Sequence, residues 1–314
     1  MANTLSPTRA LVRSPRVIFL LTIHALLSPT PAGALPQQAG RVECNAIRSK
    51  VLAQPVRYCA LLPPSYDADK ARRYPVLYYL HGLGDNEQSL VNLGGWNLVE
   101  NLREKGKAGE FLIFAPDGGR SFYINSRDAR VRYEDFFIRE FVPAMEKKYR
   151  ARAGRASRGI TGISMGGYGA LHMAFKYPQL FGAVSSHMGA LIEKIPPALT
   201  DARELGRGLG FLGDIFGRPF DRAYWDRNSP FTLARRASGL ARLKIYFDCG
   251  RDDTYGFDAG AQALHELLQS RGIAHEFHIY PGGHDWDFVS EHMSASMELH
   301  SRTFGLNVPS GRQR

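Results

Sequence analysis

Apolar residues follow two alternating patterns along most of the chain. Short continuous apolar runs, typical of strands buried on both faces of a sheet, occur at 75–80, 111–116, 159–163, 183–188, 243–249 and 276–281. Longer stretches with helical spacing of apolar residues occur at 134–149, 166–177, 257–271 and 289–304. This alternation predicts an α/β fold, in which a mostly parallel central sheet is covered by helices on both faces.

Residues 190–231 depart from this alternation. The segment is rich in glycine, proline and aromatic residues, and it falls between two predicted strands. Long irregular insertions in compact domains are often lids or binding loops. We therefore predict a single domain over 35–314 with a lid-like insertion at about 190–231. A surface excursion containing a few short helices is the competing interpretation.

Two β-like stretches near the N-terminus each carry a cysteine. They read RVECNAI and PVRYCALL, and a turn near 52–54 would join them as a hairpin. Cys44 and Cys59 would then face each other, and an oxidising compartment would favour a disulfide between them. The sequence alone does not fix the register of the hairpin. The third cysteine, Cys249, ends an apolar run and is expected to be a small buried side chain.

The first 34 residues have the pattern of a signal peptide. A basic start without acidic residues is followed by an apolar run at 17–27, a break at Pro29 and an Ala-x-Ala motif at 32–34. The apolar run is short for a membrane span, so we expect cleavage before Leu35 and a secreted or periplasmic protein. An uncleaved anchor is the alternative interpretation.

Composition and charge exclude several other classes of protein. With 44% hydrophobic and 22% charged residues, the chain resembles neither a disordered protein nor a membrane bundle. The net charge of +10 is spread along the sequence, whereas nucleic-acid binding requires a concentrated basic stripe. The cysteine spacing fits no zinc site. We therefore expect no nucleic-acid partner, no stable membrane insertion and no metal, while the oligomeric state stays open.

The most specific motif is the glycine-flanked serine in GISMG at 162–166. It follows an apolar run and opens a predicted helix, which is the setting that a G-x-S-x-G nucleophile turn requires. The glycines allow strand and helix to approach, and the helix N-terminus adds positive potential beside the serine. We therefore predict that Ser164 is a nucleophile on a sharp strand-to-helix turn.

A serine hydroxyl needs a general base, and the sequence contains ten histidines. In folds with this motif, the chain order is nucleophile, acid and then histidine, each on a loop after a strand. His284 in HIYPGGHDW fits this order because it follows the last predicted strand on a Gly-Gly turn. His187, which ends the strand after the nucleophile helix, is the main competing candidate. The acid is expected in CGRDD at 249–253, where Asp252 and Asp253 both qualify by position.

An oxyanion hole of two backbone N–H groups would complete such a site. One donor is the residue after the nucleophile, Met165, and the second comes from the loop after an early strand. LHGLGDN at 80–86 supplies that loop, and Leu83 is the predicted donor.

Together these motifs resemble the esterase D family of α/β-hydrolases. The resemblance extends over nearly the whole chain after the leader and includes LLPPSYD (61–67), RYPVLYYLHGLGDN (73–86), PDGGRSFYINS (116–126), YEDFFIREFVPAMEKKY (133–149), GISMGGYGAL (162–171), CGRDD (249–253) and YPGGHDW (280–286). The family pattern C-G-x-x-D implies that Asp253, three residues after the glycine, is the acid. The family also implies the α/β-hydrolase fold and acyl-ester chemistry without a metal or organic cofactor.

The family implies the kind of reaction more strongly than the substrate. Its members include carboxylesterases, acetyl xylan and feruloyl esterases, S-formylglutathione hydrolase and mycolyltransferases. We expect a serine carboxylesterase that acts on a small or polysaccharide-linked ester. Acyl transfer to an alcohol and an inactive binding domain on the same scaffold are the alternatives. Candidate substrate contacts are the side chains of polar or aromatic residues in the predicted loops and insertion: Tyr123, Asn125, Trp225 and Trp286.

Overall fold

The computed structural model describes residues 40–197 and 210–306. Within these residues, eight strands form one sheet in the order β1-β2-β4-β3-β5-β6-β7-β8. The strands are β1 (Arg41–Arg48), β2 (Pro55–Leu62), β3 (Val76–Leu80), β4 (Leu112–Pro116), β5 (Arg158–Ile163), β6 (Ala183–His187), β7 (Lys244–Gly250) and β8 (Glu276–Tyr280). β1, β2 and β4 pair antiparallel, whereas the pairs from β4 through β8 are parallel. The predicted α/β class and its mostly parallel sheet are therefore confirmed.

The connections between the strands are mainly helical. The helices are α1 (Ser65–Ala68), α2 (Ser89–Asn92), α3 (Gly95–Glu104), α4 (Tyr133–Phe136), α5 (Val142–Lys148), α6 (Met165–Lys176), α8 (Gly210–Phe216), α9 (Arg222–Asn228), α10 (Pro230–Arg236), α11 (Phe257–Ser270) and α12 (Trp286–Thr303). Short 3₁₀ turns, η2 (Arg155–Ser157) and η4 (Leu240–Arg242), precede β5 and β7. No helix in the described part of the chain is both long and apolar enough to cross a membrane.

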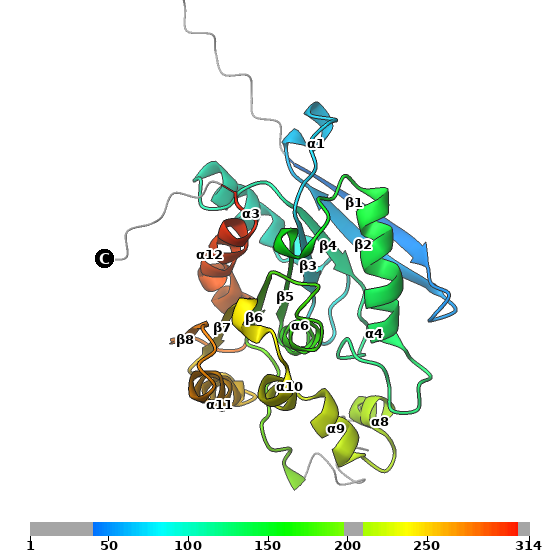
Figure 1. Ribbon diagram of the computed structural model, residues 1–314, viewed down its shortest axis with the longest axis vertical. Coiled ribbons are helices and arrows are strands. Elements are labelled where there is room, and N and C mark those ends of the chain that lie inside the picture. Colours follow the sequence, from blue (N-terminus) through cyan, green and yellow to red (C-terminus); the bar gives the residue numbers. More distant parts are fainter. Residues whose placement is uncertain (1–39, 198–209, 307–314) are drawn as a thin grey trace, which may run out of the picture. The chain divides into compact units, whose positions relative to one another are not determined.

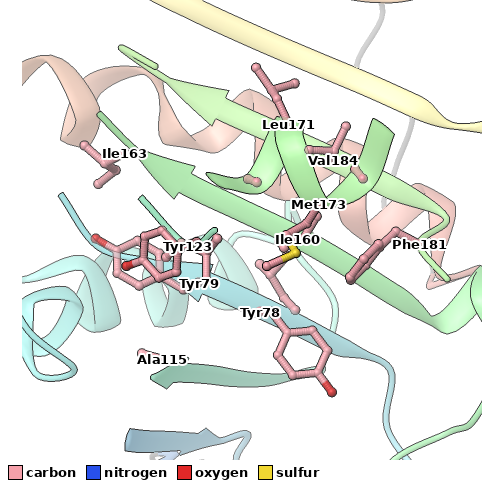
Figure 2. Packing of buried hydrophobic residues seen from close by; sticks show 14 of the residues in the cluster. Tyr78, Tyr79, Ala115, Tyr123, Ile160, Ile163, Leu171, Met173, Phe181 and Val184 are labelled. Atoms are coloured by element: carbon pink, nitrogen blue, oxygen red, sulfur yellow. The ribbon is translucent and has the colours of Figure 1, made fainter. Parts of the chain in front are cut away.

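Helices cover both faces of the sheet, as the side chains of β6 show. Adjacent residues of a strand point to opposite faces. His187 contacts Ser296 of α12, whereas a Cβ placed on Gly167 of α6 would meet the hydroxyl of Ser186. α12 and α6 therefore lie on opposite faces of the sheet, and α3 packs beside α12 (Figure 1). Figure 2 shows the core between the sheet and α6, with Ile160 of β5 near Met173.

The predicted helix over 134–149 contains an unpredicted π-helical turn, η1 (Phe137–Phe141), between α4 and α5. Pro143 follows this turn inside the first turn of α5. Because proline has no backbone N–H, it cannot donate the usual helical hydrogen bond to the carbonyl four residues earlier, at Arg139. The π turn, a local interruption of an α-helix, thus lies directly before the turn that contains this proline.

The hairpin at the edge of the sheet has the register that a disulfide requires. Cys44 lies opposite Cys59 in the β1–β2 ladder, and their Cα atoms are 4.1 Å apart. The structure contains the Cys44–Cys59 disulfide. Cys249 of β7 carries a free, buried thiol.

The described part of the 190–231 insertion contains α8, α9 and the start of α10. Asp221 caps α9 by accepting a hydrogen bond from the backbone N–H of Tyr224 at 2.9 Å. Within α9, Trp225 packs against Phe216 of α8 with ring centroids 4.8 Å apart. Residues 198–209 of the insertion and the predicted signal peptide at 1–34 lie outside the described residues.

A buried polar cluster attaches this insertion to α6. The backbone oxygen of Asn228 at the end of α9 lies 2.8 Å from Nδ1 of His172, and it also accepts from the hydroxyl of Tyr168 at 2.9 Å. Glu134 of α4 lies 2.9 Å from Nε2 of His172. Burial raises the pKa of Glu134, but His172 and Lys176 lower it more, to about 2. Through His172, the ionised carboxylate of α4 is thus linked to both α6 and the end of α9.

Candidate active site

Ser164 lies in a strained turn between β5 and α6. Its φ of 55° is in the left-handed region, which non-glycine residues rarely adopt. A Cβ on Gly162 would lie 2.2 Å from the carbonyl oxygen of Gly166, and a Cβ on Gly166 would lie 1.9 Å from that of Leu80. Both glycines are therefore required for strand, turn and helix to approach as closely as they do.

His284 joins this serine to a carboxylate. Nε2 of His284 lies 3.0 Å from Oγ of Ser164, and Nδ1 lies 2.7 Å from Oδ2 of Asp253. His284 follows β8 in the loop before α12, whereas Asp253 follows β7 in the loop before α11. Three side chains from separate loops thus form one hydrogen-bonded chain at the carboxyl ends of parallel strands.

The environment of Asp253 keeps its carboxylate ionised. Burial raises the pKa of this group, but the hydrogen bonds and charge of His284, the Tyr255 N–H and the Cys249 thiol together lower it below its usual value. The Tyr255 N–H donates at 2.8 Å and the Cys249 thiol donates at 3.3 Å. An ionised Asp253 favours the tautomer of His284 with a proton on Nδ1, which leaves Nε2 available to accept the serine proton.

The geometry distinguishes the two acid candidates. Asp252 is exposed, and its backbone N–H donates to the carbonyl of Gly282 at 3.0 Å. This contact ties the loop after β7 to the loop that carries His284. Asp253 is the carboxylate that reaches the imidazole.

The side chain of His187, the competing histidine, contacts Asp248 of β7 and Ser296 of α12. Its Nδ1 contacts Asp248 at 2.9 Å and its Nε2 contacts Ser296 at 2.9 Å, and all three side chains are buried. Both ring nitrogens are therefore occupied inside the protein. The geometry leaves His284 as the histidine beside the serine hydroxyl.

The loop after β3 approaches the serine from the other side. A Cβ on Gly82 would lie 3.7 Å from Cβ of Ser164. His81 fixes this loop, because its Nδ1 lies 2.8 Å from the Gly82 carbonyl while its Nε2 accepts from the N–H of Gly118 at 2.8 Å. Leu83 and Met165, the predicted oxyanion donors, both line the pocket that contains Ser164. Met165 is the first residue of α6, where backbone N–H groups have no partner within the helix.

Residues 49–297 match the model of a protein family described as "Putative esterase". The chain belongs to this esterase family.

Similar proteins of known name include several esterases. The chain is 31% identical to an esterase of Mycobacterium tuberculosis (strain H37Rv) over 244 residues, which are 71% of this chain and 51% of that protein. The chain thus spans about half the length of that relative. It is 27% identical to an acetyl esterase of Caldicellulosiruptor saccharolyticus over 263 residues, which are 81% of this chain and 96% of the relative.

Solved structures agree with this assignment. A ferulic acid esterase superimposes with a TM-score of 0.73 at 26% identity, covering 85% of this chain and 100% of the other. An S-formylglutathione hydrolase from Agrobacterium tumefaciens has a TM-score of 0.69 at 19% identity, covering 85% and 96%, and shows the shared fold. The predicted α/β-hydrolase fold is confirmed.

Ser164 and His284 lie in the wall of a pocket of about 670 Å³. Trp225 of the insertion and Trp286 of α12, two of the predicted substrate contacts, line the same pocket. Tyr255 and Phe257 also line it, with ring centroids 4.8 and 5.5 Å from that of His284. Sequence reasoning missed these two aromatics, although the sequence DDTYGF places them directly after the acid.

The other two predicted contacts, Tyr123 and Asn125, are not among the residues that line this pocket. Tyr123 is fully buried, and its hydroxyl donates to the carbonyl of His81 at 3.0 Å. Asn125 uses its side-chain oxygen to accept from the backbone N–H of Asp135 at 3.2 Å. The Tyr123 side chain is thus enclosed by the protein, whereas Asn125 is half-buried. Each makes a hydrogen bond that holds a loop in place.

The described residues offer no evident metal centre. In the ranges 40–197 and 210–306, no group of three or more His, Cys, Asp or Glu side chains is arranged to hold a metal ion.

Proposed function

We propose that this protein is a serine esterase that cleaves acyl esters through an acyl-enzyme on Ser164. The observation that carries the proposal is the hydrogen-bonded chain from Ser164 through His284 to Asp253 in the wall of a large pocket. In this proposal Ser164 is the nucleophile, His284 the general base, and Asp253 the acid that orients and stabilises the imidazole.

Acylation begins when Ser164 Oγ attacks the ester carbonyl carbon and its proton passes to Nε2 of His284. The carbonyl π electrons move to oxygen, and the N–H groups of Met165 and Leu83 stabilise the resulting oxyanion. The tetrahedral intermediate then collapses, and the C–O bond to the alcohol breaks. The departing oxygen takes the proton from His284 Nε2, which leaves the acyl group bound to Ser164.

Deacylation repeats these steps with water as the nucleophile. His284 accepts a proton from water as the water oxygen attacks the acyl carbonyl carbon. The bond to Ser164 Oγ breaks when the second tetrahedral intermediate collapses, and the serine regains its proton from His284. The carboxylic acid is released, and the enzyme returns to its initial state without a cofactor.

The size and lining of the pocket favour an ester with a large apolar or aromatic group. Phe122, Trp225, Phe257 and Trp286 contribute aromatic surface to a pocket of about 670 Å³, which is within the range of small-molecule sites. An acetyl group alone would leave most of this volume unfilled. The similarity to a ferulic acid esterase favours phenolic acid esters, including those attached to polysaccharides. The insertion at 190–231 would shape the acyl or alcohol specificity through Trp225.

A location outside the cytoplasm fits two features. The first 34 residues have the pattern of a cleaved signal peptide. The Cys44–Cys59 disulfide is of a kind that persists in oxidising compartments. Mass analysis of the protein recovered from the culture medium or periplasm would test this part of the proposal, with Leu35 as the expected first residue.

A fluorophosphonate probe, which reacts with activated serines, tests the proposed nucleophile. The wild-type protein should be labelled with a single adduct, and Ser164→Ala should abolish labelling without changing the far-UV circular dichroism spectrum. Ser290→Ala, which alters an exposed serine of α12, is the matched control and should be labelled like the wild type. A folded wild-type protein that resists the probe would refute the proposal.

A further inference from the structure

A second Ser-His-Asp arrangement lies behind the candidate active site, on the face of the sheet covered by α12. Nδ1 of His187 lies 2.9 and 3.0 Å from the two oxygens of Asp248, and its Nε2 lies 2.9 Å from Oγ of Ser296. The hydroxyl of Tyr246 donates to Asp248 at 2.7 Å. Each of these four side chains is at most 1% exposed, and none lines the Ser164 pocket. We call them the buried array.

The buried array meets the backbone that holds Ser164. His187 and Asp248 are paired neighbours on β6 and β7. The backbone oxygen of His187 accepts from the N–H of Ser164 at 2.9 Å, and that of Asp248 accepts from the N–H of Met188 at 2.9 Å. The backbone oxygen of Ser164 in turn accepts from the N–H of Ala190 at 3.0 Å. The side chains of the array therefore cross-link the strand ends at the same rung that fixes the nucleophile turn.

A second serine–histidine contact joins β6 to α12 beside the buried array. Ser185 precedes His187 by two residues and contacts Nε2 of His300 at 2.9 Å, while it donates to Thr161 at 2.6 Å. Ser296 and His300 are four residues apart on α12. Two residues of a strand and four residues of a helix both span roughly 6–7 Å along their axes. The spacing of the two polar contacts is therefore the same on β6 and on α12. The Ser185 contact is the rung farther from Ser164.

Packing alone does not account for this arrangement. A buried pair of polar or charged groups often contributes no more stability than apolar side chains of similar volume, but it can specify one register. Ser164 needs such specification because its positive φ persists only where the surroundings enforce it. We propose that the buried array, chiefly His187 and Asp248, positions the nucleophile turn. These are positioning residues, and the inference rests on the proposed role of Ser164.

Two matched serine variants test the inference. Ser296→Ala and Ser185→Ala each remove a fully buried hydroxyl that contacts a histidine, but only the first belongs to the array. Ser296→Ala should lower kcat and the fluorophosphonate labelling rate about 2- to 10-fold, the kinetic equivalent of one hydrogen bond. Its KM and the pH midpoint of activity should stay unchanged. Ser185→Ala should keep the wild-type kcat, even at an equal loss of thermal stability.

Asp248 provides a graded second series. Asp248→Asn retains an oxygen that can accept from His187, so it should keep most of the activity. Asp248→Leu leaves Nδ1 of His187 without its carboxylate partner and should lower kcat per folded molecule by about 10- to 100-fold, as expected for a displaced nucleophile. If Asp248→Leu does not fold, the serine pair decides.

Each outcome bears on a distinct claim. Equal effects of Ser296→Ala and Ser185→Ala on kcat would overturn the positioning role, as would an unchanged kcat in Ser296→Ala. If the folded wild-type protein is not labelled at all, the proposed nucleophile is wrong and the inference falls with it. Normal labelling of the wild type with an unaffected array variant refutes the inference alone.

Discussion

The buried side chain of His300 should make the stability of the folded protein depend on pH. The side chain is fully buried on α12, where Nε2 contacts Ser185 Oγ at 2.9 Å. Because Ser185 donates its proton to Thr161, Nε2 of His300 is the donor in the contact with Ser185. Nδ1 has no hydrogen-bond partner within the described structure. Burial, and then the charge of His187, lowers the pKa of His300 from 6.5 to about 3.

The direction of the pH effect follows from this lowered pKa. Between pH 6.5 and pH 3, the unfolded chain binds a proton at His300 and the folded protein does not. Stability therefore falls as the pH decreases, by about 1.4 kcal/mol per pH unit. From pH 7.5 to pH 5 this single group should remove about 2 kcal/mol. The lowered carboxylate pKa values, such as about 2 for Glu134, act at lower pH, because they matter only below about pH 4.5.

Urea unfolding at pH 7.5 and pH 5 measures this effect in the wild type and in His300→Gln. The glutamine amide can still donate to Ser185 but does not titrate. Between pH 7.5 and pH 5, the free energy of unfolding of His300→Gln should therefore fall by about 2 kcal/mol less than that of the wild type. His278→Gln, in an exposed position of β8, should retain the wild-type slope. Equal pH dependence in the wild type and His300→Gln would refute the reasoning.

Three further predictions concern the turn, the pocket rim and the hairpin. Gly166→Ala places a methyl group 1.9 Å from a β3 carbonyl oxygen, so it should lower kcat/KM by about 10²-fold; wild-type kinetics would contradict this. Tyr255→Ala removes a ring that is 68% exposed and edge-on to His284. It should raise KM for an aromatic ester roughly 2- to 10-fold and leave the melting temperature unchanged; an unaltered KM would exclude a substrate contact. Replacing both Cys44 and Cys59 by alanine opens a loop with a sequence separation of 15 and should lower the free energy of unfolding by about 3 kcal/mol. Urea midpoints matching the wild type would argue against it.

Features encoded locally in the sequence were predicted well. The six apolar runs correspond to β3–β8, because a strand buried on both faces is recognisable from its own residues. The turn at Ser164 was recognisable because its glycines, strand and helix are contiguous. Chain order then selected His284, whose imidazole lies beside the Ser164 hydroxyl in the structure. These predictions needed no knowledge of distant contacts.

Features that depend on side-chain direction were predicted less well. Nothing in the residues alone separates Asp252 from Asp253, because their loop is shaped by contacts with Gly282. Tyr123 was misassigned since its loop does lie near the site, but its φ of 59° accompanies a side chain directed inward to His81. Position near a strand end does not specify which way a loop residue points.

The buried array illustrates a third limit. The sequence marks His187 only as a competing base, because its partners lie on β7 and α12, 61 and 109 residues away. Only the register of β6 against β7 and the position of α12 bring these side chains together. Long-range pairing of this kind leaves no local pattern in the sequence.

Ester hydrolysis through an acyl-enzyme on Ser164 requires that the acyl group be bound to this serine during turnover. Rapid acid quenching during turnover of an aromatic ester, followed by intact-protein mass spectrometry and peptide mapping, tests it directly. We expect a mass increase equal to one acyl group, located on the peptide that contains Ser164 and absent in Ser164→Ala. Turnover by a folded Ser164→Ala variant at the wild-type rate, or an acyl group on another residue, would contradict the account.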